Sequence, residues 1–246
     1  MKTLIAVLVL FCFFAASDST KRDPRLHLVS PPVAPKHADF DLCSICFQLS
    51  GEGLTEILNI ILNVGLLGGC NELCSLIKSP ELLQTACNIV CDVVGIKIFV
   101  DVIQRVDLDT IYFCELLKLC KVNDHGDAEI RSLTITPNDG PAGTVFQIKL
   151  DFTTRNGTGT GELIVDVDTI DGLPVTGGEL LESLAPGAYS VSMNLNTGAA
   201  CQQEPCESWQ PGTYNVTTTM CNGECGSSHP HSQIYANATR SFQITQ

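Results

Sequence analysis

Cysteine is the residue type whose number and spacing carry the most chemistry in this chain, with 13 cysteines in 246 residues. The N-terminus indicates what they do. Residues 1–3 carry a charge, residues 4–14 are apolar and residues 15–17 are small, which is the pattern of a secretory signal peptide cleaved near Ser17. Cleavage removes Cys12 and leaves twelve cysteines, an even number. In an oxidising compartment this predicts six disulfides and no free catalytic thiol.

Three sequons, at Asn156, Asn215 and Asn237, agree with passage through the secretory pathway. We therefore expect glycans at these asparagines and a secreted, extracellular protein, with a lysosome or acidic vesicle as the alternative destination. The formal net charge of −13 argues against nucleic acid as a partner, because phosphates need a basic face. It also argues against tight binding to anionic lipid at neutral pH.

Three short stretches have the residue types of a ligand site, and each has a plainer explanation. The glycine-rich segment 156–161 lacks the Lys-Ser/Thr of a phosphate loop, so a glycosylated hairpin is expected. The acids of 166–171 lack EF-hand spacing and fit a solvated strand face. Residues 221–231 hold two cysteines and two histidines. Oxidised thiols would leave only His229 and His231, a weak copper or zinc pair, so no metal is expected. We find no nucleophile elbow or His–nucleophile pair, and expect no enzyme, no catalytic residue and no cofactor.

Composition divides the rest of the chain into three parts. Residues 18–40 are rich in proline and have little apolar pattern, which predicts a flexible arm. Within this arm, Lys21-Arg22 is either a dibasic processing site or a pair of solvated charges. Residues 41–122 hold eight cysteines and one proline, and residues 127–246 hold four cysteines and all three sequons. Two domains joined by a short turn are therefore expected.

Aliphatic residues in 41–122 recur with the period of helices. The i, i+3, i+4, i+7 stripe of one helix face is occupied by Leu54, Ile57, Leu58, Ile61 and Leu62. A second apolar row on this segment, and double rows at 87–100, predict helices that are apolar almost all round. Such helices should be buried, yet a domain of about 80 residues has little interior in which to bury them.

Helix geometry pairs the middle cysteines. Cys70 and Cys74 are four residues apart, as are Cys87 and Cys91, so each pair lies on one helix face. A Lys-Ser-Pro-Glu turn at 78–81 separates the two pairs. Two antiparallel helices joined there would place Cys74 opposite Cys87 and Cys70 opposite Cys91. Zinc binding is the alternative, and export disfavours it.

Residues 127–246 change to the alternating pattern of strands, which we predict at 133–137, 144–152, 162–168 and 241–245. The motif Pro-Gly-x-Tyr-x-Val begins at 186 and again at 211, and marks two turns that each launch a strand. About seven strands predict an antiparallel immunoglobulin-like sandwich. The cysteines expected to pair among themselves here, with the connectivity left open, are Cys201, Cys206, Cys221 and Cys225.

The cysteine spacing of the helical part resembles that of a saposin B-type domain. C-x-x-C at 43–46, an inner pair and C-x5-C at 114–120 carry this resemblance. The disulfides it implies are Cys43–Cys120, Cys46–Cys114 and Cys74–Cys87, and a Cys70–Cys91 bridge is added from helix geometry. The expected fold is therefore multidomain. An all-α, disulfide-braced saposin-like domain of about five helices at 41–122 is followed by an all-β immunoglobulin-like sandwich at 127–246.

Over the mature chain, the sequence is similar to the countin-like secreted proteins of social amoebae, which couple such a domain to a C-terminal β domain. The segments that carry the similarity are CSIC at 43–46, LNIILN at 58–63, DLDTIYFCELLKLC at 107–120 and HPHS at 229–232. The similarity implies an extracellular cell–cell signal or a subunit of a secreted complex.

Saposin-like domains bind or perturb lipid, and this gives the surplus aliphatic rows a role. The residues we expect to line a lipid-facing concavity are Leu58, Ile61, Leu62, Val94, Ile98 and Val102. Two alternatives use the same rows: an oligomer seam in a protein-interaction module, and an amoebapore-like surface that permeabilises membranes. The expected partner is a lipid or membrane surface, with secreted proteins or a second copy of the chain as further partners.

Overall fold

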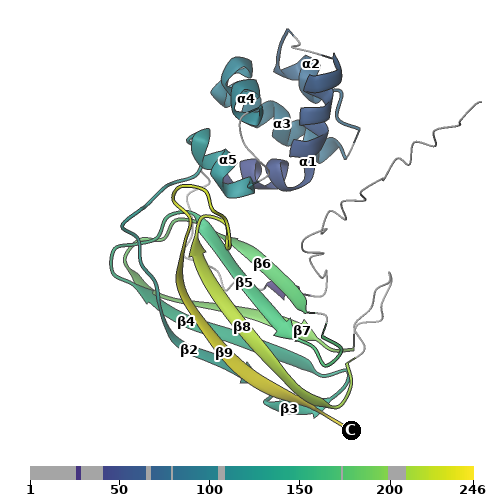
Figure 1. Ribbon diagram of the computed structural model, residues 1–246, viewed down its shortest axis with the longest axis vertical. Coiled ribbons are helices and arrows are strands. Elements are labelled where there is room, and N and C mark those ends of the chain that lie inside the picture. Colours follow the sequence, from purple (N-terminus) through teal and green to yellow (C-terminus); the bar gives the residue numbers. More distant parts are fainter. Residues whose placement is uncertain are drawn as a thin grey trace, which may run out of the picture.

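The computed structural model describes residues 26–28, 41–64, 68–78, 80–104, 109–172, 174–198 and 209–246. The predicted signal peptide, the Lys21-Arg22 site, Cys201 and Cys206 lie outside the described residues. Figure 1 shows the helices gathered at one end of the molecule, with the strands in two sheets beneath them.

The described part of 41–122 contains five helices, of which only α1 is long. They are α1 (Leu42–Val64), α2 (Cys70–Cys74), α3 (Glu81–Val94), α4 (Ile96–Ile103) and α5 (Thr110–Leu116). Gly95 separates α3 from α4 and has a φ of 84°, a conformation that glycine adopts readily and that ends a helix. The double apolar row predicted at 87–100 therefore belongs to two helices and not to one.

The apolar side chains of these helices pack into one core. Leu49, Ile57 and Val90 are fully buried within it. Phe99 of α4 meets Phe113 of α5 edge to face, with ring centroids 6.2 Å apart. Each buried aliphatic or aromatic side chain contributes about 1.5–3 kcal/mol of transfer free energy, so this core supports the short helices.

Nine strands are described. They are β1 (Leu26–Leu28), β2 (Glu129–Thr136), β3 (Asp139–Pro141), β4 (Val145–Thr154), β5 (Gly161–Asp168), β6 (Val175–Leu181), β7 (Gly187–Asn196), β8 (Gly212–Asn222) and β9 (Gln233–Thr245). On β4 the pattern of exposed and buried residues alternates, so that one face of the strand lines a core and the other faces water.

The strands form two sheets around a second apolar core. The four-stranded sheet has the order β1-β7-β4-β2, and the five-stranded sheet has the order β3-β9-β8-β5-β6. β3 pairs with β9 in parallel. β2 of the first sheet packs beside β9 of the second, so the two sheets curve into a half-barrel. The largest of its fully buried side chains are Phe146, Phe152, Tyr214 and Phe242.

The repeated Pro-Gly-x-Tyr-x-Val motif produces the same local contact twice. β7 begins at Gly187 and β8 at Gly212, the glycines of the two copies. The Tyr189 hydroxyl donates to the backbone oxygen of Ala185 at 2.7 Å. The Tyr214 hydroxyl donates to the backbone oxygen of Gln210 at 2.9 Å. Each tyrosine thus ties the turn to the strand that it launches.

The expected fold class, an all-α saposin-like domain followed by an immunoglobulin-like sandwich, is wrong. The structure is mostly β, in two sheets that form a half-barrel with a parallel strand pair. The sheets also include residues that precede the helices, and they contact the helical core. β1 precedes the helices and pairs with β7, and Leu180 of β6 packs against the helical core. Three residues in a proline-rich segment have no detectable period, which is why pattern analysis missed β1.

Candidate functional site

Four disulfides brace the helices. The structure pairs Cys43 with Cys120, Cys46 with Cys114, Cys70 with Cys91, and Cys74 with Cys87. The first two join the beginning of α1 to α5 and the residues after it, and the other two join α2 to α3. These are the pairs expected from the resemblance and from helix geometry. In the half-barrel, Cys221 is bonded to Cys225, four residues away.

The six residues expected to face lipid do not lie on one common surface in the structure. Ile61 is buried in the helical core. Leu58, Val94 and Val102 are half-buried against the same core. Leu62 and Ile98 are exposed, at 69% and 54%. The residues that periodicity grouped together are therefore split between core and surface.

A different apolar row is exposed on α3. Leu82 and Val93 are 61% and 54% exposed, and half-buried Ile89 stands between them. Ile89 lies about two helical turns after Leu82, and Val93 lies about three turns after it, so the three side chains share one side of the helix. We call this row the α3 stripe. Ile89 and Val93 belong to the aliphatic rows predicted from the sequence at 87–100, although they are not among the six residues named above, and Leu82 lies outside those rows.

α1 has the length and composition of a membrane-spanning segment. Its stretch Leu42–Asn63 has a mean hydropathy of 1.2. Leu49 and Ile57 on this stretch are fully buried against the other helices. The apolar character of α1 is therefore explained by its place at the centre of the helical core.

A polar groove of about 570 Å³ opens between α1 and the segment that follows α2. Glu56 accepts a hydrogen bond there from the backbone N–H of Lys78, at 2.7 Å. The groove is lined by Glu52, Thr55, Glu56, Asn59, Ile60, Asn63, Leu76 and Lys78. With so many polar side chains it differs from the apolar concavity that the sequence predicted.

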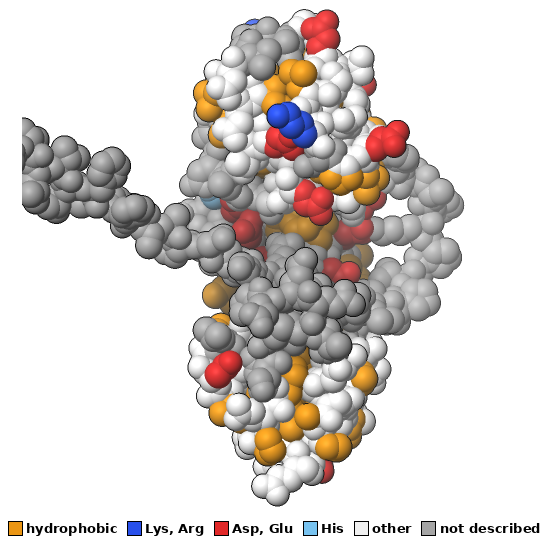
Figure 2. All heavy atoms as spheres, turned by 90° about the vertical axis from the view of Figure 1, so that its right-hand side faces the viewer, with side chains coloured by type: hydrophobic (Ala, Val, Ile, Leu, Met, Phe, Trp, Pro, Cys, Tyr) orange, Lys and Arg blue, Asp and Glu red, His pale blue; other side chains and the backbone are white. Residues whose placement is uncertain are grey.

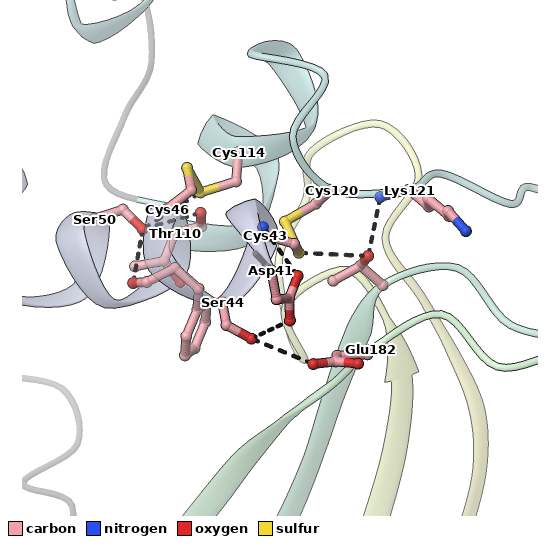
Figure 3. The surroundings of a disulfide bond; sticks show 12 residues. Asp41, Cys43, Ser44, Cys46, Ser50, Thr110, Cys114, Cys120, Lys121 and Glu182 are labelled. Carbon is pink, nitrogen blue, oxygen red and sulfur yellow. Dashed lines mark hydrogen bonds between the residues drawn. A yellow bond between two sulfur atoms is a disulfide. The ribbon is translucent and has the colours of Figure 1, made fainter. Parts of the chain in front are cut away.

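The helical part meets the half-barrel in two places, of which the first surrounds the Cys43–Cys120 disulfide. The Ser44 hydroxyl lies 2.6 Å from Asp41 and 3.3 Å from Glu182, which follows β6 (Figure 3). The backbone N–H of Thr160 donates to the backbone oxygen of Lys121 at 2.8 Å. Its side-chain oxygen accepts a hydrogen bond from the N–H of Lys121 at 3.1 Å. This contact fixes the chain where it passes from the helices to the strands.

The second meeting place, which we call the α5 junction, joins the first turn of α5 to the loop 222–232 between β8 and β9. Oε2 of Glu224 accepts hydrogen bonds from the backbone N–H and the hydroxyl of Thr110, at 3.0 and 3.1 Å. The Ser227 hydroxyl donates to Asp109. Figure 2 shows acidic side chains gathered around the boundary between the helical end and the sheets.

Both histidines of the predicted weak metal pair belong to the α5 junction. The His229 ring stacks on Tyr112 of α5, with centroids 4.5 Å apart and planes 8° from parallel. Nδ1 of His231 lies 2.6 Å from Asp124. Within the described residues, no group of three His, Cys, Asp or Glu side chains is placed to hold a metal ion. The two rings instead hold the helices to the loop.

Two carboxyl groups of the α5 junction have altered acidity. Glu115 is 7% exposed, and its Oε1 has no hydrogen-bond partner among the described residues. Burial raises the pKa of the Glu115 carboxyl to about 7. The charges of Asp109 and Asp124 act in the same direction, and that of His231 opposes them. Burial, with Asp109 nearby, also raises the pKa of Glu224, and the two hydrogen bonds from Thr110 partly oppose this shift. The surroundings of Glu115 and Glu224 thus disfavour the ionised form of both carboxyl groups.

The sequon asparagines and the acids of 166–171 lie on the half-barrel strands or in the turns between them. The hairpin expected at 156–161 is wrong, because this segment joins β4 to β5 of the other sheet and residues 157–161 are buried. Asn156, Asn215 and Asn237 are all exposed, the first in the turn after β4 and the others on β8 and β9. Asp166 on β5 accepts a hydrogen bond from Thr176 of the neighbouring β6 at 2.6 Å. These positions are accessible to glycosylation and are typical of an outer strand face.

The α5 junction could not be predicted from the sequence because its residues are far apart along the chain. Thr110 and Glu224 are 114 residues apart, and Asp109 and Ser227 are 118 apart. No local period or motif links such positions. The HPHS segment at 229–232 is distinctive in the sequence, but only the fold shows that its His229 stacks on Tyr112.

Both parts of the chain match described families. Residues 41–118 match the Countin N-terminal domain, and residues 128–246 match the Countin C-terminal domain. The match for the helical residues is therefore to a countin domain, and the expected saposin B-type domain is not supported.

Two relatives from Dictyostelium discoideum align over most of the chain. Countin-1 is 35% identical over 220 residues, which cover 89% of this chain and 83% of that protein. Countin-3 is 34% identical over 202 residues, which cover 82% of this chain and 89% of that protein. Among solved structures, a CARDB domain from Pyrococcus furiosus aligns with 50% of this chain and 96% of that chain. Its identity is 9% and its TM-score 0.35, too low to support an argument.

Proposed function

This chain belongs to the countin family, and on that premise we propose that it is an exported, non-enzymatic factor that acts outside the cell and contacts lipid through its helical part. The N-terminal pattern at 1–17, the braced cysteines and the exposed sequon asparagines support export. N-terminal sequencing of the protein from culture medium tests this part, with a mature start just after Ser17 expected. Retention of the protein inside the cell would contradict it.

The α3 stripe is the observation that supports lipid contact. Leu82 and Val93 are more than half exposed on a helix that two disulfides hold in place. An aliphatic side chain gains about 1.5–3 kcal/mol when it is fully transferred from water to apolar surroundings. We propose that this outer surface contacts the lipid while the helices stay packed together, because Ile57 and Ile61 are buried in the core.

Charge beside the α3 stripe defines the lipid that fits it. Glu81 and Asp92, at the two ends of α3, are both exposed. Carboxylates at these positions repel anionic headgroups at neutral pH. We therefore propose a zwitterionic surface, or an anionic one in mildly acidic surroundings.

Vesicle flotation tests the lipid proposal, using phosphatidylcholine vesicles at pH 5 and pH 7. The variant Leu82→Ser/Val93→Ser is expected to lower the bound fraction about tenfold, since 1.4 kcal/mol corresponds to a tenfold change in affinity. The matched control is Ile234→Ser/Val145→Ser, which removes side chains of 60% and 49% exposure from the half-barrel. Equal binding by both variants, or no binding by the unaltered chain, would overturn the proposal.

The same samples distinguish the two alternatives. A defined oligomer that persists after delipidation, and that the α3 variant breaks, would assign the stripe to a subunit seam. Leakage of an encapsulated dye from the vesicles would favour a membrane-permeabilising protein. Native mass spectrometry of protein purified from medium identifies the lipid class from the adduct mass.

A further inference from the structure

The α5 junction holds the two parts of the molecule together mainly through groups that titrate. The side chains that face one another across it are Asp109, Tyr112 and Glu115 from α5 and its N-cap, Asp124 from the connection, and Glu224, His229 and His231 from the loop 222–232. Lys118 and Lys121, the nearest lysines in the sequence, are exposed. The strength of this contact must therefore depend on pH.

Glu224 completes the first turn of α5 from the other part of the molecule. Asp109 caps the helix locally and accepts a hydrogen bond from the N–H of Tyr112 at 2.8 Å. The N–H of Thr110 has no such local partner and donates to Glu224. If the loop moves away, this N–H is released to water. The Thr110 amide is thus a specific reporter of whether the junction is closed.

Each side of the junction is anchored to its own part of the molecule. On the sheet side, the Cys221–Cys225 disulfide closes the beginning of the loop, and the N–H of Cys225 donates to Glu162 of β5 at 3.2 Å. On the helical side, Cys114 of α5 is bonded to Cys46 of α1. A weakened junction would therefore release the loop 222–232 from α5 and leave each part folded, while the contact around the Cys43–Cys120 disulfide remains.

The charges facing Glu115 and Glu224 are largely of the same sign as their own. Glu115 lies near Asp109 and Asp124, and Glu224 lies near Asp109. The His231 ring, which also faces Glu115, acts in the opposite direction to these carboxylates. When the carboxyl groups ionise, the closed contact places several negative charges at a buried boundary. Such charges are costly to bury unless they are paired.

We propose that the α5 junction is a pH-sensitive coupling, closed while Glu115 and Glu224 are protonated and loosened when both are ionised. The loop 222–232 is then held against α5 in mildly acidic surroundings and is released from it in neutral or alkaline ones, while the contact around the Cys43–Cys120 disulfide persists. The coupling does not depend on lipid contact, so the two proposals stand or fall separately.

The direction follows from linkage between protonation and closure. Burial raises the pKa of both carboxyl groups, in the case of Glu115 from 4.5 to about 7. A group with a raised pKa contributes its full stabilisation of the closed state below the ordinary value. That stabilisation is lost as pH rises through the raised value. The α5 junction is therefore expected to loosen between about pH 5 and pH 8, with most of the change in the upper part of that range.

Hydrogen exchange at the Thr110 amide of the full-length chain tests the proposal. After correction for the intrinsic pH dependence of exchange, protection is expected to fall at least about tenfold between pH 5.5 and 8.5. In Glu115→Gln/Glu224→Gln, whose side chains stay neutral, the change should be less than about threefold. Glu179→Gln is the matched control, because burial raises the pKa of this half-buried carboxyl on β6, away from α5. It should retain the pH dependence of the unaltered chain.

Constant protection in the unaltered chain, or an unchanged pH dependence in the double variant, would overturn the proposal. If the double variant does not fold, a carbon-13 titration of Glu115 in the unaltered chain decides. A midpoint near 7 supports the coupling, whereas a midpoint near the ordinary 4.5 contradicts it.

Discussion

The helical part is shorter than the half-barrel, and the two are held together differently. The helices rely on four disulfides around one apolar core, and three of the five are eight residues or shorter. The half-barrel relies on long paired strands and large buried rings, with one described disulfide that spans four residues. Short helices bury too little surface to be stable alone, whereas each paired strand is supported by its neighbours. Covalent bracing is therefore concentrated where the individual elements are shortest.

Truncating a buried ring should reveal how far the half-barrel depends on packing. Phe146→Ala is expected to cost about 3–5 kcal/mol, because the ring is fully buried and its removal leaves a cavity. Urea unfolding followed by the strand signal measures the loss. The neighbouring Val145→Ala, on an exposed side chain, should cost less than about 0.5 kcal/mol. A loss of similar size at both positions would mean that the core does not hold the sheets.

Removing a disulfide should have its main effect on the helices. Cys46→Ser/Cys114→Ser opens a link between residues 68 apart and is expected to cost about 4 kcal/mol through the loop entropy of the unfolded chain. Cys221→Ser/Cys225→Ser opens a link between residues four apart and should cost about 2 kcal/mol. Helical circular dichroism in denaturant measures the first, and the strand signal measures the second. An equal loss of unfolding free energy in the two variants would contradict the expectation that the disulfides matter most for the helices.

The two copies of the tyrosine turn provide a finer test within the half-barrel. Tyr214 is fully buried, and its hydroxyl both donates to the backbone oxygen of Gln210 and accepts from its N–H at 3.0 Å. Tyr214→Phe should cost about 1–3 kcal/mol, because buried backbone groups lose their partner. Tyr189→Phe removes a more exposed bond and should cost less than about 1 kcal/mol. Thermal unfolding of both variants would show whether burial or the motif sets the cost.

Replacing Asp151 should give the smallest change in stability. The pH dependence of this change should be opposite to that of the α5 junction. Hydrogen bonds from Ser190, Lys149 and Ser132 lower the pKa of this β4 carboxyl from 3.8 to about 2. A lowered pKa stabilises the fold above the ordinary value, and this stabilisation is lost as pH falls towards 2. Asp151→Asn should therefore lower the melting temperature slightly at pH 6 and not at all near pH 2. A difference that persists at pH 2 would contradict this account.

Much of the local structure was predictable, because its causes lie within a few residues. Cysteines four apart share a helix face, so the Cys70–Cys91 and Cys74–Cys87 pairs followed from spacing. Strands begin where the tyrosine motif predicted them, at Gly187 and Gly212. The fold class was wrong because cysteine spacing restricts which sulfurs can meet and does not determine how helices and sheets assemble around them.

The exposed apolar residues were predicted less well. Periodicity identified rows on the helices but not which row faces outward. Ile61 proved to be core, whereas Leu82 and Val93 are exposed. Gly95 contributed to the error, since its left-handed backbone divides a segment that looks continuous in sequence. A row is buried or exposed according to the neighbours that pack on it, and those neighbours come from other elements.

The sequence by itself determined the apolar periods, the cysteine spacings, the sequons and the turn motifs, all of which act over one or two turns of chain. The tertiary structure decided that Leu26–Leu28 joins β7, that β2 packs beside β9, and that the HPHS segment lies against α5. It also brought Glu115 and Glu224 to one buried boundary. Local patterns arise from backbone geometry, which each residue experiences with its near neighbours. The α5 junction arises from contacts across 114 residues, which exist only after both parts have folded.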